Sequence, residues 1–189
     1  MMKKILFATT NKRKLNEAKA AFKDFGIKVD QIELDINEIQ SKDAKYISLH
    51  KAESAFRLVH KPVVITDTSW KIPSLKGFPG GYMKDISSWF EPEDFINLIK
   101  NKNDKRISFT ECIVYKDSLN TKIFSEEYWG IISDKPRGKG NSIERVAEFK
   151  GFTIAEKYDN GEFSHDPKEY VWYSLAKWYS KYNIPKLEK

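Results

Sequence analysis

The chain has 189 residues, of which 40% are hydrophobic, 32% charged and 14% aromatic. This length and composition predict one globular domain and exclude disordered, collagen-like and coiled-coil chains. No stretch reaches the roughly 18 apolar residues of a membrane-spanning helix, so we expect no membrane partner. The single cysteine, Cys112, cannot form an internal disulfide, and we therefore expect a reducing, cytoplasmic location.

The formal net charge is +6, from 33 basic and 27 acidic residues. Such a balance favours anionic partners, among them nucleotides, nucleic acid and acidic surfaces, without choosing between them. The basic residues are spread along the chain, and only residues 12–14 form a dense cluster. An ordinary lysine-rich surface is therefore the better interpretation of the charge taken alone.

The first half of the chain alternates predicted strands and helices. Apolar spacing predicts strands at 5–8, 29–36 and 62–66. It also predicts a helix over about 12–25 that stops at Gly26. A second helix is expected to be capped by Ser41 or Asp43 and to run to Val59. The strand at 62–66 is expected to end at Asp67. Alternation of this kind is typical of an α/β protein.

The second half begins with a turn-rich stretch at 73–82. A helix is predicted from residue 91 to 99, a β-hairpin from strands at 108–116 and 121–132, a short strand at 152–155 and a final helix over 167–182. Asp166 followed by Pro167 is the expected start of that last helix. The hairpin after alternating elements predicts a mixed central sheet.

Three segments have residue types suited to chemistry. The turn from Thr9 to Lys14 links a strand to a helix N-terminus, where backbone N–H groups and cations suit phosphate, although simple capping explains it equally well. Glu38 and Asp67 have the oxygen ligands that Mg²⁺ prefers, but spacing alone does not bring them together. The three histidines have no zinc-ligand spacing with Cys112, and no nucleophile motif is present.

Short motifs occur in a specific order along the chain. They are Thr9-Thr10-Asn11-Lys12-Arg13-Lys14, Asn37-Glu38-Ile39-Gln40, Lys51-Ala52, the stretch 62–68 (PVVITDT), the stretch 75–82 (LKGFPGGY), Pro136-Arg137-Gly138, Ala155-Glu156 and Ser164-His165. Together they resemble the inosine triphosphate pyrophosphatase family, which acts on non-canonical purine nucleoside triphosphates. The resemblance spans nearly the whole chain, and the first half is the more specific part.

The resemblance implies a fold, an activity and a set of site residues. The expected fold is α/β, a mixed central β-sheet flanked by helices in an elongated two-lobed single domain over residues 1–189. The expected reaction is Mg²⁺-dependent hydrolysis, with Mn²⁺ as an alternative metal, of a nucleoside triphosphate to a monophosphate and pyrophosphate by a homodimer. The residues expected to bind phosphate are Thr9, Asn11, Lys14, Lys51 and Thr68. The metal would be bound by Glu38 and Asp67, and Asp67 would also orient or deprotonate the attacking water. The base would be contacted by Ser164 and His165.

The chain also departs from this family at particular positions. Thr66 replaces the first of two adjacent acids, residues 141–146 lack the aromatic of the family's base-holding motif, and Asp166 replaces an arginine that contacts the base. These changes predict altered base recognition and a reduced rate.

Two rival functions follow from the same residues. One is a nucleotide-binding or sensing protein that keeps the phosphate site and has weak or no activity. The other is a basic nucleic-acid-binding module that uses the lysines and an aromatic tail, Tyr170, Trp172, Tyr173, Trp178 and Tyr179. Nucleic acid is the least favoured partner, because aromatics at helical spacing usually face a core.

Overall fold

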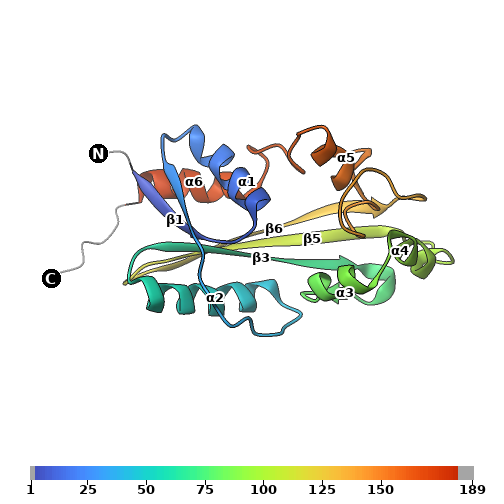
Figure 1. Ribbon diagram of the computed structural model, residues 1–189, viewed down its shortest axis with the longest axis horizontal. Helices are drawn as coiled ribbons and strands as arrows, with labels where there is room; N and C mark the ends of the chain where they lie inside the picture. The colour runs from blue at the N-terminus through green and yellow to red at the C-terminus, as the bar shows by residue number, and fades with distance from the viewer. Residues whose placement is uncertain (1–2, 183–189) are drawn as a thin grey trace.

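A mixed β-sheet runs along the molecule in this computed structural model, which describes residues 3–182 (Figure 1). The strand order is β2-β1-β3-β5-β6-β7-β8, with β4 paired to β3 only. The strands are β1 (Lys4–Ala8), β2 (Lys28–Ile32), β3 (Val63–Ile72), β4 (Phe78–Gly80), β5 (Arg106–Lys116), β6 (Thr121–Ile132), β7 (Ala147–Phe149) and β8 (Phe152–Thr153). Strand β1 is parallel to β2 and β3, whereas the other pairs are antiparallel. The expected mixed sheet is confirmed.

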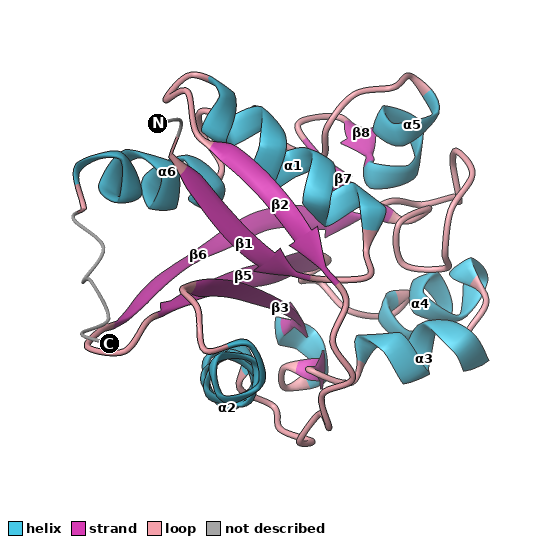
Figure 2. Cartoon of the chain, turned by 60° about the vertical axis from the view of Figure 1, so that its left-hand side comes forward, coloured by secondary structure: helices cyan, strands magenta, loops and turns pink. Residues whose placement is uncertain are grey.

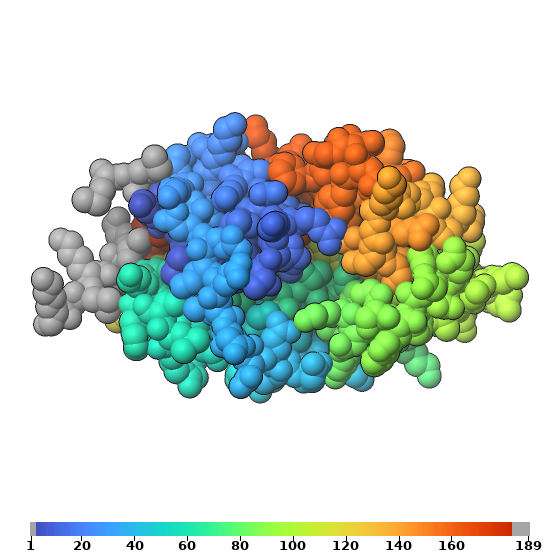
Figure 3. Space-filling view, in the orientation of Figure 1, coloured from blue at the N-terminus to red at the C-terminus, as the bar shows by residue number. Residues whose placement is uncertain are grey.

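Helices cover both faces of the sheet. They are α1 (Lys12–Lys23), α2 (Ala44–Val59), α3 (Met83–Trp89), α4 (Pro92–Ile99), α5 (Ile154–Asp159) and α6 (Val171–Lys181), with a short 3-10 helix η1 (Pro73–Leu75). Helices α1 and α6 lie on one face and α2 on the other (Figure 2), while α3, α4 and α5 gather at one end of the molecule (Figure 1). The outline is elongated, as expected (Figure 3).

Each face of the sheet has its own hydrophobic core. The larger core, under α1 and α6, includes Phe7, Phe22 and Trp172, all essentially inaccessible to solvent. The smaller core lies under α2, where alanines pack on Ile65 and Cys112. Because side chains alternate along a strand, successive residues of β3 and β5 contribute to opposite cores. The same alternation determines to which face of the sheet each polar side chain of β3 and β5 points.

Helices α1 and α2 begin where the sequence predicts. The Asn11 side chain accepts hydrogen bonds from the backbone N–H groups of Arg13 (2.9 Å) and Lys14 (3.2 Å), which caps α1. Asp43, rather than Ser41, caps α2 by accepting from Lys45 N at 2.9 Å.

The third strand is longer than predicted. Strand β3 was expected to end at Asp67, and this is wrong because the strand continues to Ile72. Parallel pairing with β1 involves only Val63 and Val64, but antiparallel pairing with β5 extends to Lys71 and supports the additional residues. Asp67 therefore lies in mid-strand, just beyond the point where β1 ends.

The last third of the chain also differs from expectation. Asp166 and Pro167 do not start the final helix: the Asp166 carboxylate accepts from Lys168 N (2.8 Å) in a turn, and α6 begins at Val171. Residues 152–155 form a two-residue strand followed by α5, which the Thr153 and Glu156 capping box initiates. Helix α3 was not predicted at all.

The aromatic tail belongs to the core. Trp172 and Tyr179 on α6 are 1% and 0% exposed, so they cannot serve as a base-stacking platform for nucleic acid. In the part of the chain that the structure describes, every helix is too short or too polar to cross a bilayer.

Candidate active site

A cavity of about 470 Å³ opens where β1 ends and β3 continues without it. Its walls come from the turn after β1, the loop after β2, helices α1, α2 and α3, strands β3 and β5, and residues 141–170. Because no β1 residue covers β3 beyond Val64, side chains from both faces of the sheet reach the same space. Every candidate residue from the sequence except His165 lines this cavity.

The turn after β1 forms one wall. Thr9 Oγ1 accepts a hydrogen bond from Asn11 N at 3.1 Å, and Asn11 in turn caps α1. The N-terminus of a 12-residue helix thus points at the cavity, and the positive end of its dipole favours an anion there.

On the α2 face, one lysine holds two carboxylates. Lys51 Nζ lies 2.6 Å from Glu38 Oε1 and 3.6 Å from Asp67 Oδ1. Sequence spacing could not place Glu38 near Asp67, but the structure brings them to the same ammonium group. The hydrogen bond from Lys51 lowers the pKa of Glu38, whereas burial raises the pKa of Asp67 above its usual value.

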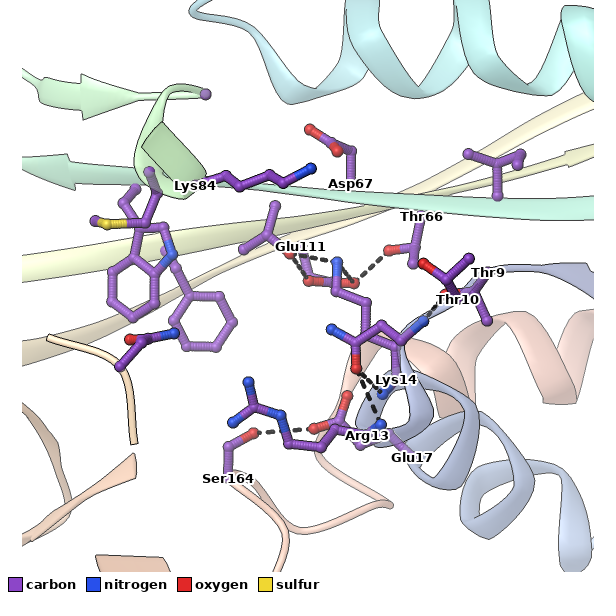
Figure 4. A pocket seen from close by; sticks show the side chains of 18 of the residues that line it. Thr9, Thr10, Arg13, Lys14, Glu17, Thr66, Asp67, Lys84, Glu111 and Ser164 are labelled. Carbon is purple, nitrogen blue, oxygen red and sulfur yellow. Dashed lines mark hydrogen bonds and ion pairs between the residues drawn. The ribbon is translucent and has the colours of Figure 1, made fainter. Parts of the chain in front are cut away.

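On the α1 face, a second lysine meets a buried acid that the sequence reading missed. Lys14 Nζ donates to Thr68 Oγ1 at 2.7 Å and lies 3.3 Å from Glu111 Oε1 (Figure 4). The hydroxyl groups of Thr66 and Thr68 both donate to the Glu111 carboxylate. A single glutamate inside the apolar run Ile107–Tyr115 was the available sequence signal for this residue.

The end of the cavity away from Lys51 is lined by three charged residues, Arg13, Glu17 and Glu144, of which the sequence placed only Arg13 near the site, in the cationic turn 9–14. Arg13 Nη1 lies 2.6 Å from Glu144 Oε1, and its guanidinium group stands 4.7 Å from the centre of the Tyr158 ring. Glu17 is 7% exposed, and burial raises its pKa to about 7. Ser164 Oγ is 3.4 Å from Glu17 Oε1, so Ser164 faces this end of the cavity (Figure 4).

His165 is placed elsewhere. Its ring packs among Phe109, Tyr128, Phe149 and Tyr170, with the ring centre 4.5 Å from that of Tyr128, and it does not line the cavity. Burial lowers its pKa to about 4, which keeps the imidazole neutral. The structure therefore does not bring His165 to the position expected for a base contact.

Comparison with known proteins identifies the relatives of this chain. A sequence model of the Ham1 family matches residues 5–143. The chain belongs to the Ham1 family. A dITP/XTP pyrophosphatase of Methanopyrus kandleri is 30% identical over 93% of this chain and 96% of its own length, and one of Hyperthermus butylicus is 27% identical over 96% and 97%. The expected relationship to inosine triphosphate pyrophosphatases is confirmed, and with it the expected class of enzyme, a hydrolase of nucleoside triphosphates.

Solved Ham1 structures share the fold. A Coxiella burnetii HAM1 protein superposes with a TM-score of 0.77 at 18% identity, covering 96% of this chain and 100% of that one. The Staphylococcus aureus Ham1 protein gives 0.73 at 23% identity, covering 94% and 98%. The α/β architecture with a mixed central sheet is therefore that of Ham1 proteins.

Two carboxylates of the cavity, Glu38 and Asp67, are a donor set that fits a magnesium ion. Within residues 3–182, no cluster of three or more His, Cys, Asp or Glu side chains could hold a metal. Glu38 and Asp67 nevertheless converge on one cationic group, which shows that their oxygens can face a single positive charge. Mg²⁺ usually binds through one or two carboxylates together with phosphates and waters, so this pair meets its requirement.

Proposed function

We propose that this Ham1 protein is a Mg²⁺-dependent nucleoside triphosphate pyrophosphohydrolase with altered base recognition. The observation that supports it best is the convergence of Lys14, Lys51, Glu38 and Asp67 on one cavity at the N-terminus of α1. Cations, carboxylates and a helix dipole at one place are what a triphosphate and its metal need.

The phosphate chain would lie between the two lysines. Lys14 approaches it from the α1 face and Lys51 from the α2 face, while Thr9 and Asn11 hold the turn that presents the helix N-terminus. Thr68 fixes the Lys14 ammonium. Such positioning and charge neutralisation supply most of the catalysis in phosphoryl transfer.

Hydrolysis would proceed by attack of water on the α-phosphorus. The water oxygen bonds to that phosphorus, the bond from the α-phosphorus to the bridging oxygen breaks, and pyrophosphate leaves with the bonding electrons. Asp67 orients the water and takes its proton. Glu38 and Asp67 would hold Mg²⁺, which when bound neutralises charge on the phosphate oxygens.

The base would lie at the other end of the cavity. There Glu144 and Arg13 form an ion pair, with the guanidinium group next to Tyr158 and with Ser164 close by. A guanidinium plane can stack on a base and donate to its carbonyl oxygens. Because this end has an ion pair where the family resemblance implies an aromatic side chain, we expect a base preference different from that of the relatives.

Pyrophosphate release from a panel of standard and modified triphosphates, with Mg²⁺, tests the proposal. In ¹⁸O-labelled water the label should enter the nucleoside monophosphate, since the α-phosphorus is attacked. Asp67→Asn and Glu38→Gln should each lower kcat/KM by on the order of 100-fold or more. The Glu53→Gln variant loses the same charge at a half-buried position of α2 outside the cavity and should retain full activity.

Other outcomes would contradict the proposal. Label in the pyrophosphate would show attack on the wrong phosphorus. Saturable nucleotide binding without product would favour the rival sensing function.

We also propose a homodimer, which light scattering after size-exclusion chromatography tests directly.

A further inference from the structure

Glu111 is the most deeply buried acid of the cavity. It lies on β5 directly opposite Thr68 of β3 and is 1% exposed, yet it lines the cavity. Its place on the strand turns its side chain to the α1 face, whereas the neighbouring Cys112 belongs to the core under α2. A carboxylate taken out of water costs several kcal/mol unless partners compensate it.

Both carboxylate oxygens of Glu111 have hydrogen-bonding partners, and a lysine balances the charge. Thr66 donates to Oε1 and Thr68 donates to Oε2, so that each carboxylate oxygen accepts from one threonine of β3. Lys14 supplies the compensating charge at 3.3 Å from Oε1 and also donates to Thr68 Oγ1. The flexible lysine chain is thus tied to the sheet at two points, and its ammonium group faces the cavity at a fixed place.

The structure assigns Glu111 the role of positioning residue for Lys14 in the proposed pyrophosphohydrolase reaction. Its carboxylate fixes the direction from which the ammonium meets the phosphate chain. The acid that the family resemblance expects at Thr66 on β3 is thereby replaced by one from β5, and the Thr66 hydroxyl serves as a donor to it. This inference rests on the proposed function, because its effect is measured on the same reaction.

If Glu111 positions Lys14, its substitution should lower kcat without weakening the binding of phosphate groups. In Glu111→Gln, the neutral amide lacks the charge that attracts the Lys14 ammonium group, so that group is held less firmly and kcat should fall by about 10- to 100-fold. The affinity for inorganic pyrophosphate, measured by calorimetry, should stay the same or rise, because a negative charge beside the phosphate site has been removed. A purely structural role would instead weaken both quantities and lower the melting temperature.

A double-mutant cycle with Lys14 isolates the coupling. Lys14→Met should lower kcat, and adding Glu111→Gln should change kcat by less than about threefold, because the group to be positioned is gone. Additive losses would overturn the inference. So would a Glu111→Gln variant that needs more Mg²⁺ for half-maximal rate, since that would mark Glu111 as a metal ligand.

Moving the acid back to β3 gives an independent test. In the exchange variant Thr66→Glu/Glu111→Thr, the same two residues change places on one face of the sheet. Recovery of kcat to within about threefold of the original chain is expected. An exchange variant that folds but remains as slow as Glu111→Gln would overturn the inference.

The controls separate the two levels of the proposal. Glu127→Gln removes the same charge from an exposed position on β6 and should leave kcat unchanged. If the original chain turns over no triphosphate, the proposed function itself fails. If it turns over triphosphates and Glu111→Gln does so equally well, only the role of Glu111 fails.

Discussion

Replacement of Glu17 by glutamine should remove the contribution that this buried residue of α1 makes to the pH dependence of stability. Glu17 is 7% exposed, and burial raises its pKa from 4.5 to about 7. The folded chain therefore binds a proton that the unfolded chain has already released between pH 4.5 and 7. Stability contributed by this group is full below pH 4.5 and is lost as the pH rises through 7.

The magnitude follows from the shift. One pKa unit corresponds to about 1.4 kcal/mol. Between pH 5 and pH 8, the free energy of unfolding of the original chain should therefore fall by about 2–3 kcal/mol relative to that of Glu17→Gln. The glutamine resembles the protonated acid and keeps an acceptor for Ser164, which lies 3.4 Å from Glu17.

Urea unfolding of both chains at pH 5, 6, 7 and 8 measures this difference. The Glu53→Gln variant, at a half-buried position of the same chain, should show no such trend and serves as the control. Stability curves of Glu17→Gln and the original chain that stay parallel from pH 5 to 8 would refute the reasoning from burial.

Three further predictions concern the core, the helix cap and the aromatic cluster. Phe7→Ala should lower the free energy of unfolding by about 3–5 kcal/mol in urea, because the Phe7 ring is fully buried 4.8 Å from that of Trp172; a loss below 1 kcal/mol would contradict this packing. Asn11→Asp should keep the cap of α1 and change the melting temperature little, but weaken pyrophosphate binding by about 10-fold in calorimetry, since it adds a negative charge at the anion site. Because burial lowers the pKa of His165 to about 4, the original chain should lose stability as the pH falls from 6.5 to 4. In acid unfolding curves, His165→Phe should reduce this loss by about 2 kcal/mol. Equal acid sensitivity of the two chains would contradict this prediction.

Local patterns were enough to predict most of the fold. The spacing of apolar residues gave α1, α2 and the β5–β6 hairpin, because in those segments propensity, capping and burial agree. The end of β3 was mispredicted at Asp67 because pairing with β5, a partner more than 40 residues away, decides it. At Asp166 and Pro167 the local pattern was also misleading, because Lys168 N donates to the Asp166 carboxylate in a turn and the helix begins only at Val171.

The candidate site was predictable only in part. Three of the residues proposed to bind phosphate, Thr9, Asn11 and Lys14, belong to one short motif, so a sequence pattern can point to them. Glu38 and Asp67 meet through Lys51, and no spacing rule encodes that meeting. Glu111 was missed because its partners Lys14, Thr66 and Thr68 lie on two other elements, so its role exists only once the sheet has formed.

The alternation of side chains between β3 and β5 has a consequence for how this protein can evolve. Asp67 faces Lys51, while Thr68, the next residue along β3, and Glu111, which lies opposite Thr68 on β5, face Lys14. Shifting either strand by one residue would swap these orientations and send each charge into the wrong core. The chain can therefore tolerate many substitutions around the cavity, but a single-residue insertion or deletion inside this strand pair would dismantle both lysine sites at once.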